Sequence, residues 1–409
     1  MFVFMAISLL ALGTATGVGI DFARGLNFKS ALQGAADAAA IAGASVYLNA
    51  GYSSQATTAA TDYMKNATPT LPVNNGVTSS IVLSSSGPWT VTVNASASIN
   101  STFNGLFENT IPVSVTATAK GPTNPNIDFY MLLDSSPSMA IAATQSGINT
   151  MVANTSAQSG CGFGCHESSP ASDNLGNPGG EDNYALARNL GVTLRIDNLT
   201  TATQNLMSTA STTSASNSAV YRVSIDSFDI NFNSIQTLTS NMTTAAQSAG
   251  TIKLLEMYSN NHLVSGDNNQ DADTNYDNAM SSVNTLMPSP GNGTNAKGDT
   301  PQEVLFFVTD GVEDELVNGS RQQSLMSTSW CNTIKNRGIR IAVLYTVYYP
   351  LPTNSWYNTY ISPFQSSISS NMQSCASPGL FFAVDTGGDI SAAMTALFTS
   401  AVQSAYISQ

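Results

Sequence analysis

Apolar and polar residues follow two different patterns along this chain, and the change between them falls near residue 127. Between residues 79 and 119, short runs such as WTVTVNASASI alternate apolar and polar side chains, which predicts the half-buried strands of a small antiparallel sheet. From residue 127 onward, compact apolar runs alternate with longer helical stretches. The expected strands are residues 127–133, 221–228, 304–309, 339–347 and 380–384, and the expected helices are 184–210, 242–257, 276–287, 322–336 and 389–405.

The alternation of strands and helices after residue 127 predicts an α/β fold. Strands joined by helices form a mostly parallel sheet with helices on both faces, the doubly wound arrangement. Residues 121–126 contain two prolines and two asparagines, which predicts a linker before this domain of residues 127–409. The region before the linker, residues 21–120, places a helix ahead of the small antiparallel sheet, which is a pilin-like plan.

The first 20 residues, MFVFMAISLLALGTATGVGI, carry no charged side chain. About 20 apolar residues span a bilayer, so the sequence predicts a retained transmembrane helix over residues 1–20. A cleaved signal peptide is the alternative, although the basic start typical of such peptides is missing. Residues 21–48 are rich in alanine and free of proline, so we expect the helix to continue through them.

Composition narrows the class of partner. Charged residues make up 10% of the 409 residues, and the net charge is −13 with only 13 lysines and arginines. This balance argues against nucleic acid as a partner and favours a cation. Four cysteines in a chain poor in lysine favour an oxidising compartment. Arg24 and Lys29 follow the first segment and by the positive-inside rule alone would place the rest in the cytoplasm, whereas the cysteines and composition favour export.

Three oxygen-bearing side chains follow the first strand of the α/β domain in the run DFYMLLDSSPSM, residues 128–139. They are Asp134, Ser136 and Ser138. In an open α/β sheet, ligands bind beyond the carboxyl ends of the strands, and hard divalent cations prefer such oxygen ligands. The motif alone is also compatible with a turn in which Asp134 accepts hydrogen bonds from nearby amides.

Two further segments favour the metal site. VLFFVTDG, residues 304–311, is a second buried strand that ends at Asp310, and DADTNYDNAM, residues 271–280, places Thr274 just before a helix. The three segments together resemble the metal-ion-dependent adhesion site of a von Willebrand factor A domain. The resemblance implies a site made of Asp134, Ser136, Ser138, Thr274 and Asp310. Thr309 and Asp273 receive no ligand role.

The family resemblance also implies what this site does. It implies a divalent cation, with Mg²⁺ expected first and Mn²⁺ or Ca²⁺ as alternatives, and a protein partner that supplies a carboxylate to the metal. Such a site binds and needs no proton transfer.

The N-terminus resembles a second family. GVGIDFARG, residues 17–25, and LQGAADAAAIAGA, residues 32–44, are similar to the start of TadG-like pilus-assembly proteins of the Tad system. This resemblance implies an inner-membrane anchor, a periplasmic or surface-exposed remainder, and other Tad pilus components as partners.

An insertion at about residues 140–183 separates the DxSxS motif from the next long helix. It carries CGFGCH, in which Cys161 and Cys165 are close enough for a disulfide across two glycines. Haem attachment through Cys161, Cys165 and His166 is the alternative, but its usual spacing is CxxCH. Cys331 and Cys375 lie on neighbouring late elements and predict a second disulfide. Because the insertion leaves the sheet directly after the metal motif, we expect it to lie near the metal face and to influence partner choice.

The sequence therefore predicts an envelope-anchored pilus-assembly or adhesion protein with metal-dependent partner binding. A structural minor pilin-like protein without metal-dependent binding is the alternative. An enzyme is disfavoured because the chain has two histidines and no GxSxG motif.

Overall fold

The computed structural model describes residues 2–47, 50–69, 71–73, 76–85, 89–101, 109–121, 124–167, 177, 180–257, 272–294, 297–352 and 354–405, with side chains described from residue 16 onward. The chain divides into two compact units, Met1–Asn124 with Ser216–Ser218, and Pro125–Ala215 with Ala219–Gln409. Each unit has its own hydrophobic core.

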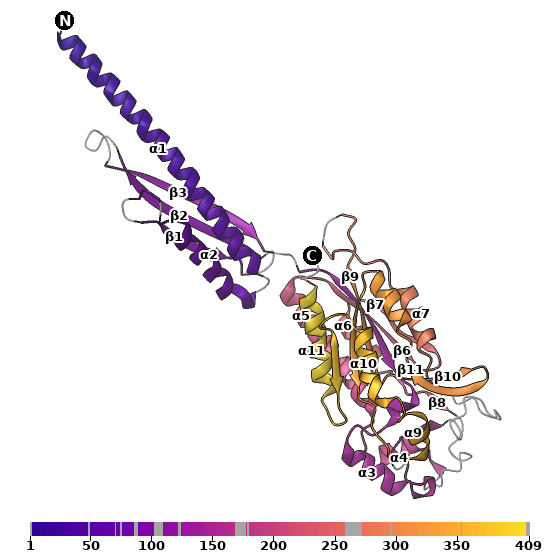
Figure 1. Cartoon of the computed structure of the whole chain (residues 1–409). Coiled ribbons are helices and arrows are strands. Elements are labelled where there is room, and N and C mark those ends of the chain that lie inside the picture. Colours follow the sequence, from indigo (N-terminus) through magenta and orange to yellow (C-terminus); the bar gives the residue numbers. More distant parts are fainter. Residues whose placement is uncertain are drawn as a thin grey trace. The chain divides into compact units, whose positions relative to one another are not determined.

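The first unit combines two helices with a small sheet (Figure 1). Its elements are α1 (Phe2–Val46), η1 (Ala50–Tyr52), α2 (Ser53–Ala67), β1 (Thr78–Leu83), β2 (Thr90–Asn100) and β3 (Thr110–Lys120). The three strands are antiparallel in the order β1-β2-β3. Val91, Val93 and Ala95 of β2 are buried against α1, as the alternating pattern predicts. A Cβ at Gly43 of α1 would lie 3.0 Å from the Ala60 Cβ of α2, so glycine allows the two helices to approach closely.

Most of the predicted membrane span falls on residues 1–15, whose side chains lie outside the described part. Within the described residues, no helix is both long enough and apolar enough to cross a membrane.

The second unit is built on a six-stranded sheet in the order β13-β12-β9-β4-β6-β7. Five strands are parallel, and the edge strand β7 pairs antiparallel with β6. The strands are β4 (Ile127–Asp134), β6 (Tyr221–Phe228), β7 (Phe232–Thr239), β9 (Gln302–Thr309), β12 (Arg340–Thr346) and β13 (Phe381–Val384). The mixed α/β architecture with a mostly parallel central sheet is confirmed.

Helices cover both faces of this sheet, and each face has its own apolar cluster. One cluster includes α3 (Gln145–Asn154), α4 (Asn183–Asn189), α5 (Arg195–Asn217), α6 (Met242–Ala249) and α11 (Ile390–Ser404). The other includes α7 (Tyr276–Leu286), α8 (Ser329–Asn336), α9 (Ser355–Tyr360) and α10 (Gln365–Cys375). Two short helices, η2 (Pro137–Ala140) and η3 (Ser156–Gln158), and two two-stranded sheets complete the unit. These sheets are β5 (His166–Glu167) with β8 (Glu256–Met257), and β10 (Val312–Val317) with β11 (Ser320–Leu325).

Two helices were predicted too long. The helix expected over 242–257 ends at Ala249, and the stretch expected as helix over 322–336 begins as strand β11. The segment 320–325 pairs along its whole length with β10, and this pairing outweighs its helix propensity. The insertion also contains a regular helix, α3, which packs Ile148 and Met151 into the core.

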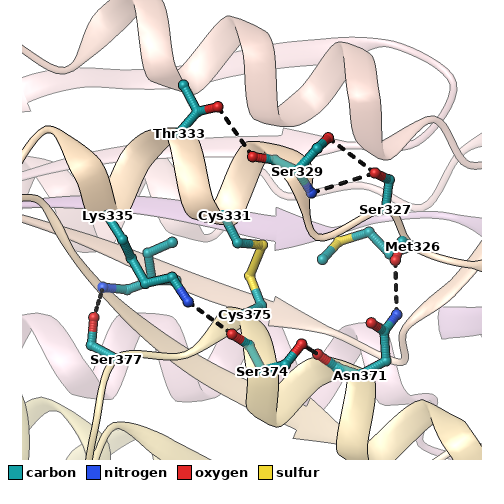
Figure 2. The surroundings of a disulfide bond; sticks show 11 residues. Met326, Ser327, Ser329, Cys331, Thr333, Lys335, Asn371, Ser374, Cys375 and Ser377 are labelled. Atoms are coloured by element: carbon teal, nitrogen blue, oxygen red, sulfur yellow. Dashed lines mark hydrogen bonds between the residues drawn. A yellow bond between two sulfur atoms is a disulfide. The ribbon is translucent and has the colours of Figure 1, made fainter.

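A disulfide joins Cys331 of α8 to Cys375 of α10, the pair expected from the sequence (Figure 2). Both side chains are fully buried in the cluster between these helices and the sheet. Beside the disulfide, the Lys335 ammonium donates a 2.8 Å hydrogen bond to the carbonyl of Ser374, which gives the two helices a second connection (Figure 2).

Candidate metal site

The candidate site lies where β4 and β9 end, at the carboxyl edge of the parallel sheet. These strands are hydrogen-bonded neighbours in register, with Leu133 opposite Val308. Asp134 is the last residue of β4, and Asp310 follows the last residue of β9. Parallel pairing therefore brings together two carboxylates that are far apart in sequence.

The three residues of the DxSxS motif contact one another. The amide and hydroxyl of Ser136 both donate to Oδ1 of Asp134, at 2.9 and 2.6 Å. The Ser136 and Ser138 hydroxyl oxygens lie 3.0 Å apart. Asp134 and Ser136 are fully buried, whereas Ser138, in η2, is partly exposed and lines a cavity.

The two carboxylates are buried and disfavour each other's charge. Burial raises the pKa of Asp134 to about 7, and the nearby Asp310 contributes to this shift. Burial also raises the pKa of Asp310, although the Ser138 hydroxyl and Arg195 partly offset the effect. Oδ1 of Asp310 accepts the Val312 amide at 3.3 Å, and within the described part of the chain Oδ2 is buried without a hydrogen-bond partner. A cation beside these groups would offset both the cost of burying two charged carboxylates and the repulsion between them.

Thr274 reaches the same place from a different segment. Its amide and carbonyl form a two-bond bridge with Asp314 of β10, at 3.0 and 3.1 Å. Thr274 is nearly buried and lines the cavity that Ser138 also lines. The hairpin β10–β11, which the sequence reasoning missed, therefore fixes the loop that carries Thr274.

A hydroxyl network behind Asp134 was also missed. Thr309, the last residue of β9, donates to Oδ2 of Asp134 at 2.7 Å. The Gly311 amide donates to the Thr309 oxygen at 3.0 Å, and the Tyr276 hydroxyl lies within hydrogen-bond distance of it. A hydroxyl at the final position of the strand beside β4 was the available signal. Asp273, left without a ligand role, lies 3.7 Å from the Arg321 guanidinium.

The insertion folds back on its own first residues, which directly follow the metal motif. Phe163 forms a bridge with Ile141, and the Gly164 amide donates to the Ala140 carbonyl at 2.8 Å. A Cβ at Gly164 would lie 2.8 Å from a terminal methyl carbon of Leu194, so a larger residue here would make that side chain shift. Together with Cys161 and Cys165, Phe163 lines the same cavity as Ser138.

The predicted disulfide between Cys161 and Cys165 is absent from this structure. Both are free thiols, and the neighbouring Cys165 lowers the pKa of Cys161. The Cys161 sulfur also accepts the Phe163 amide at 3.4 Å, so the loop already satisfies this sulfur without a covalent bond. His166, considered for haem, instead has its Nδ1 2.9 Å from a carboxylate oxygen of Asp182, within hydrogen-bond distance.

The N-terminal residues match a family model. Residues 1–46 match the model of the family described as Putative Flp pilus-assembly TadE/G-like. The N-terminal segment is TadE/G-like. No curated protein matches the chain.

Similar solved structures include proteins of pili. The conserved hypothetical protein BatB from Bacteroides thetaiotaomicron is 11% identical, with 68% of this chain and 100% of that chain covered and a TM-score of 0.35. A mutant of the PilB minor pilin from Streptococcus sanguinis is 9% identical, with 82% and 80% covered and a TM-score of 0.39. The vWF domain of the type V pili tip protein Mfa5 from Porphyromonas gingivalis is 9% identical, with 70% and 97% covered and a TM-score of 0.37.

The donor set determines which ion the site fits. Among the described residues, no three His, Cys, Asp or Glu side chains gather in a metal-binding arrangement. The site offers instead two carboxylates and the hydroxyls of Ser136, Ser138 and Thr274. An all-oxygen set of low charge, with one unpartnered carboxylate oxygen, fits a hard divalent cation that keeps bound water.

Proposed function

We propose that this chain is an envelope-anchored pilus-assembly or adhesion protein whose second unit binds a protein partner through a divalent cation. The TadE/G-like match of residues 1–46 supports the pilus setting. The observation that carries metal binding is the pair of adjacent buried carboxylates, Asp134 and Asp310, next to hydroxyls that line an open cavity.

Asp134, Ser136, Ser138, Thr274 and Asp310 would hold the cation, directly or through water. We propose Mg²⁺ first, with Mn²⁺ or Ca²⁺ as alternatives, because all three prefer oxygen ligands. When bound, the cation would supply a positive centre that accepts a carboxylate from the partner.

The chain's own residues prepare this binding. Ser136 and Thr309 each hold one oxygen of Asp134, so the carboxylate is oriented before a cation arrives. Ser138 is partly exposed at the cavity and is therefore accessible from the partner's side. Nothing in this arrangement requires a nucleophile or a general base, and we propose a binding protein rather than an enzyme.

The same proposal places the chain in the bacterial cell envelope. Residues 1–20 would anchor it in the inner membrane, with the second unit periplasmic or surface-exposed. Other Tad pilus components are the proposed partners, and the acidic composition disfavours nucleic acid.

Thermal unfolding of the full chain in detergent tests the metal site. Unfolding would be followed in EDTA, Mg²⁺, Mn²⁺ and Ca²⁺ for the wild type, for Asp134→Asn and for the control Asp226→Asn. A ligand that binds only the folded state raises its stability, by about 2.7 kcal/mol at one hundred times its Kd. We expect a metal-dependent rise in the wild type and none in Asp134→Asn.

Asp226 is a matched control because it is a buried carboxylate on the neighbouring strand β6 and burial raises its pKa to about 6. Its replacement should change basal stability and leave the metal-dependent rise intact. If no cation stabilises the wild type, metal binding is refuted and a structural minor pilin-like role becomes the better proposal.

A further inference from the structure

A cavity of about 390 Å³ opens directly beside the candidate metal site. Ser138 and Thr274 belong both to the proposed metal set and to the wall of this cavity. Pockets for whole small molecules measure about 300–1,000 Å³, so this one is at the small end of that range. A ligand bound at the metal site could therefore place a neighbouring group in this cavity.

Segments that are distant in sequence build the remaining walls. The insertion contributes Phe163, the β10–β11 hairpin contributes Arg321, and the chain after β12 contributes Tyr348 and Trp356. Trp356 lies in the first turn of α9, whose start is fixed by the Asn354 side chain, which accepts the Tyr357 amide at 2.9 Å. Three segments outside the central sheet therefore shape the cavity.

The charged groups of the wall already have partners. The Arg321 Nε donates to both carboxylate oxygens of Asp314, at 2.9 and 3.1 Å, and the guanidinium lies 3.7 Å from Asp273. Gln323 donates a further 2.9 Å hydrogen bond to Asp314. These side chains already form hydrogen bonds and ion pairs with one another, and a charged ligand would have to compete with those contacts.

The accessible part of the wall includes an exposed aromatic ring. Trp356 is 37% exposed, a large fraction for an indole ring, and the Arg321 guanidinium carbon lies 5.4 Å from its ring centroid. This contact holds the ring beside the cavity. Phe163, Val312 and the protonated thiol of Cys165 add further apolar surface.

We propose that this cavity receives a large apolar side chain, such as phenylalanine, that neighbours the metal-bound acidic residue of the protein partner. This inference rests on the proposed function and specifies the partner: an acidic residue for the metal and an aromatic residue for the cavity. Because Ser138 and Thr274 belong to both the metal site and the cavity wall, the acidic and the aromatic residue of the partner must lie close together. Arg321 is hydrogen-bonded to Asp314 and lies 3.7 Å from Asp273, so these three side chains are engaged with one another.

Blocked dipeptides test the proposal with the full chain in detergent. The probes are N-acetyl dipeptide amides of aspartate with phenylalanine, aspartate with glycine, aspartate with lysine, and asparagine with phenylalanine. Their Kd values would be measured by ligand-observed NMR titration in Mg²⁺ and in EDTA. Burial of a phenyl ring is worth roughly tenfold in affinity, so aspartate–phenylalanine should bind about tenfold more tightly than aspartate–glycine.

Two variants test whether Trp356 causes the preference for the phenylalanine peptide. Trp356→Ala should reduce the affinity for aspartate–phenylalanine to that of aspartate–glycine, while aspartate–glycine binding stays unchanged. Tyr63→Ala removes an exposed ring from α2 of the first unit, which does not line the cavity, and should change neither value. Because Trp356 is partly exposed, its removal leaves the core in place.

The outcomes separate the two proposals. Equal binding of all three aspartyl peptides in Mg²⁺, or tightest binding of the lysine peptide, overturns the aromatic subsite and leaves the metal site standing. Loss of the phenylalanine preference in Tyr63→Ala as well as Trp356→Ala also overturns it. If no aspartyl peptide binds in a metal-dependent way, the proposed function itself fails.

Discussion

The Thr309 hydroxyl donates a 2.7 Å hydrogen bond to Oδ2 of Asp134, although 175 residues separate the two along the chain. Each stands at the end of its strand, and parallel pairing of β9 with β4 places them side by side. Because Ser136 holds the other oxygen, both oxygens of Asp134 are engaged before a cation binds.

Thr309→Val should weaken metal binding without removing a proposed ligand. Groups that orient a metal ligand are typically worth roughly 10–100-fold in metal affinity. Isothermal titration of the wild type and the variant with Mg²⁺ or Mn²⁺ measures the change.

Thr346→Val is the matched control for that experiment. Thr346 ends the neighbouring strand β12, is equally buried, and its hydroxyl has no hydrogen-bond partner among the described residues. Its replacement by an isosteric apolar residue should be neutral or stabilising and should leave metal affinity unchanged. Equal affinities for Thr309→Val and Thr346→Val would contradict the orienting role of Thr309.

The opposite edge of the sheet predicts a pH dependence of stability. Glu303 of β9 lies opposite Asp128 of β4 and is buried, and in the described structure neither of its oxygens has a hydrogen-bond partner. Arg222 binds Asp128 instead, with its Nε 2.7 Å from a carboxylate oxygen. Burial, with a contribution from Asp128, raises the pKa of Glu303 from 4.5 to about 8.

The sign of this pH effect follows from proton binding. Between about pH 4.5 and pH 8 the folded state keeps the Glu303 proton while the unfolded state releases it, so this group lowers the stability as pH rises through that window. Glu303→Gln should therefore unfold at a higher temperature than the wild type above pH 8, with little difference below pH 4.5. Thermal unfolding across this range tests the prediction, and the exposed Glu256→Gln is the control. A variant curve parallel to that of the wild type would contradict it.

The disulfide between Cys331 and Cys375 should contribute substantially to stability. It closes a loop with a sequence separation of 44, for which the chain-entropy model gives about 4 kcal/mol. Cys331→Ala/Cys375→Ala should lower the free energy of unfolding by about 2–4 kcal/mol in urea titrations. Alanine is chosen because both sites are fully buried and apolar. If the wild type loses no stability on reduction, the loop is constrained by packing alone.

The thiol pair in the insertion should react unequally. The hydrogen bond from Cys165 lowers the pKa of Cys161 to about 7, and the same contact with burial raises the pKa of Cys165 well above its ordinary value. Near neutral pH, iodoacetamide should therefore label Cys161 first, as read by peptide mass mapping. Cys165→Ala removes the hydrogen-bond donor and should slow the labelling of Cys161. Equal labelling rates of the two thiols would contradict this assignment.

Several features were determined by the sequence alone. The apolar runs of β4, β6, β9, β12 and β13 are short, continuous and separated by helical stretches, so their parallel pairing follows from local pattern and connection length. Asp134 and Asp310 could be assigned to one edge of the sheet for the same reason. The four-cysteine count and the positions of Cys331 and Cys375 on late elements sufficed for one disulfide.

Only the tertiary structure decided the surroundings of the site. Three features of the site join segments that are far apart in sequence. They are the hydrogen bond from Thr309 to Asp134, the backbone bridge between Asp314 and Thr274, and the cavity that both Trp356 and Ser138 line. Hydrophobic periodicity does not predict such contacts, because they depend on the conformations of the loops that follow the strands. The physical reason is the same for β11, whose helical propensity is overridden by six residues of pairing with β10.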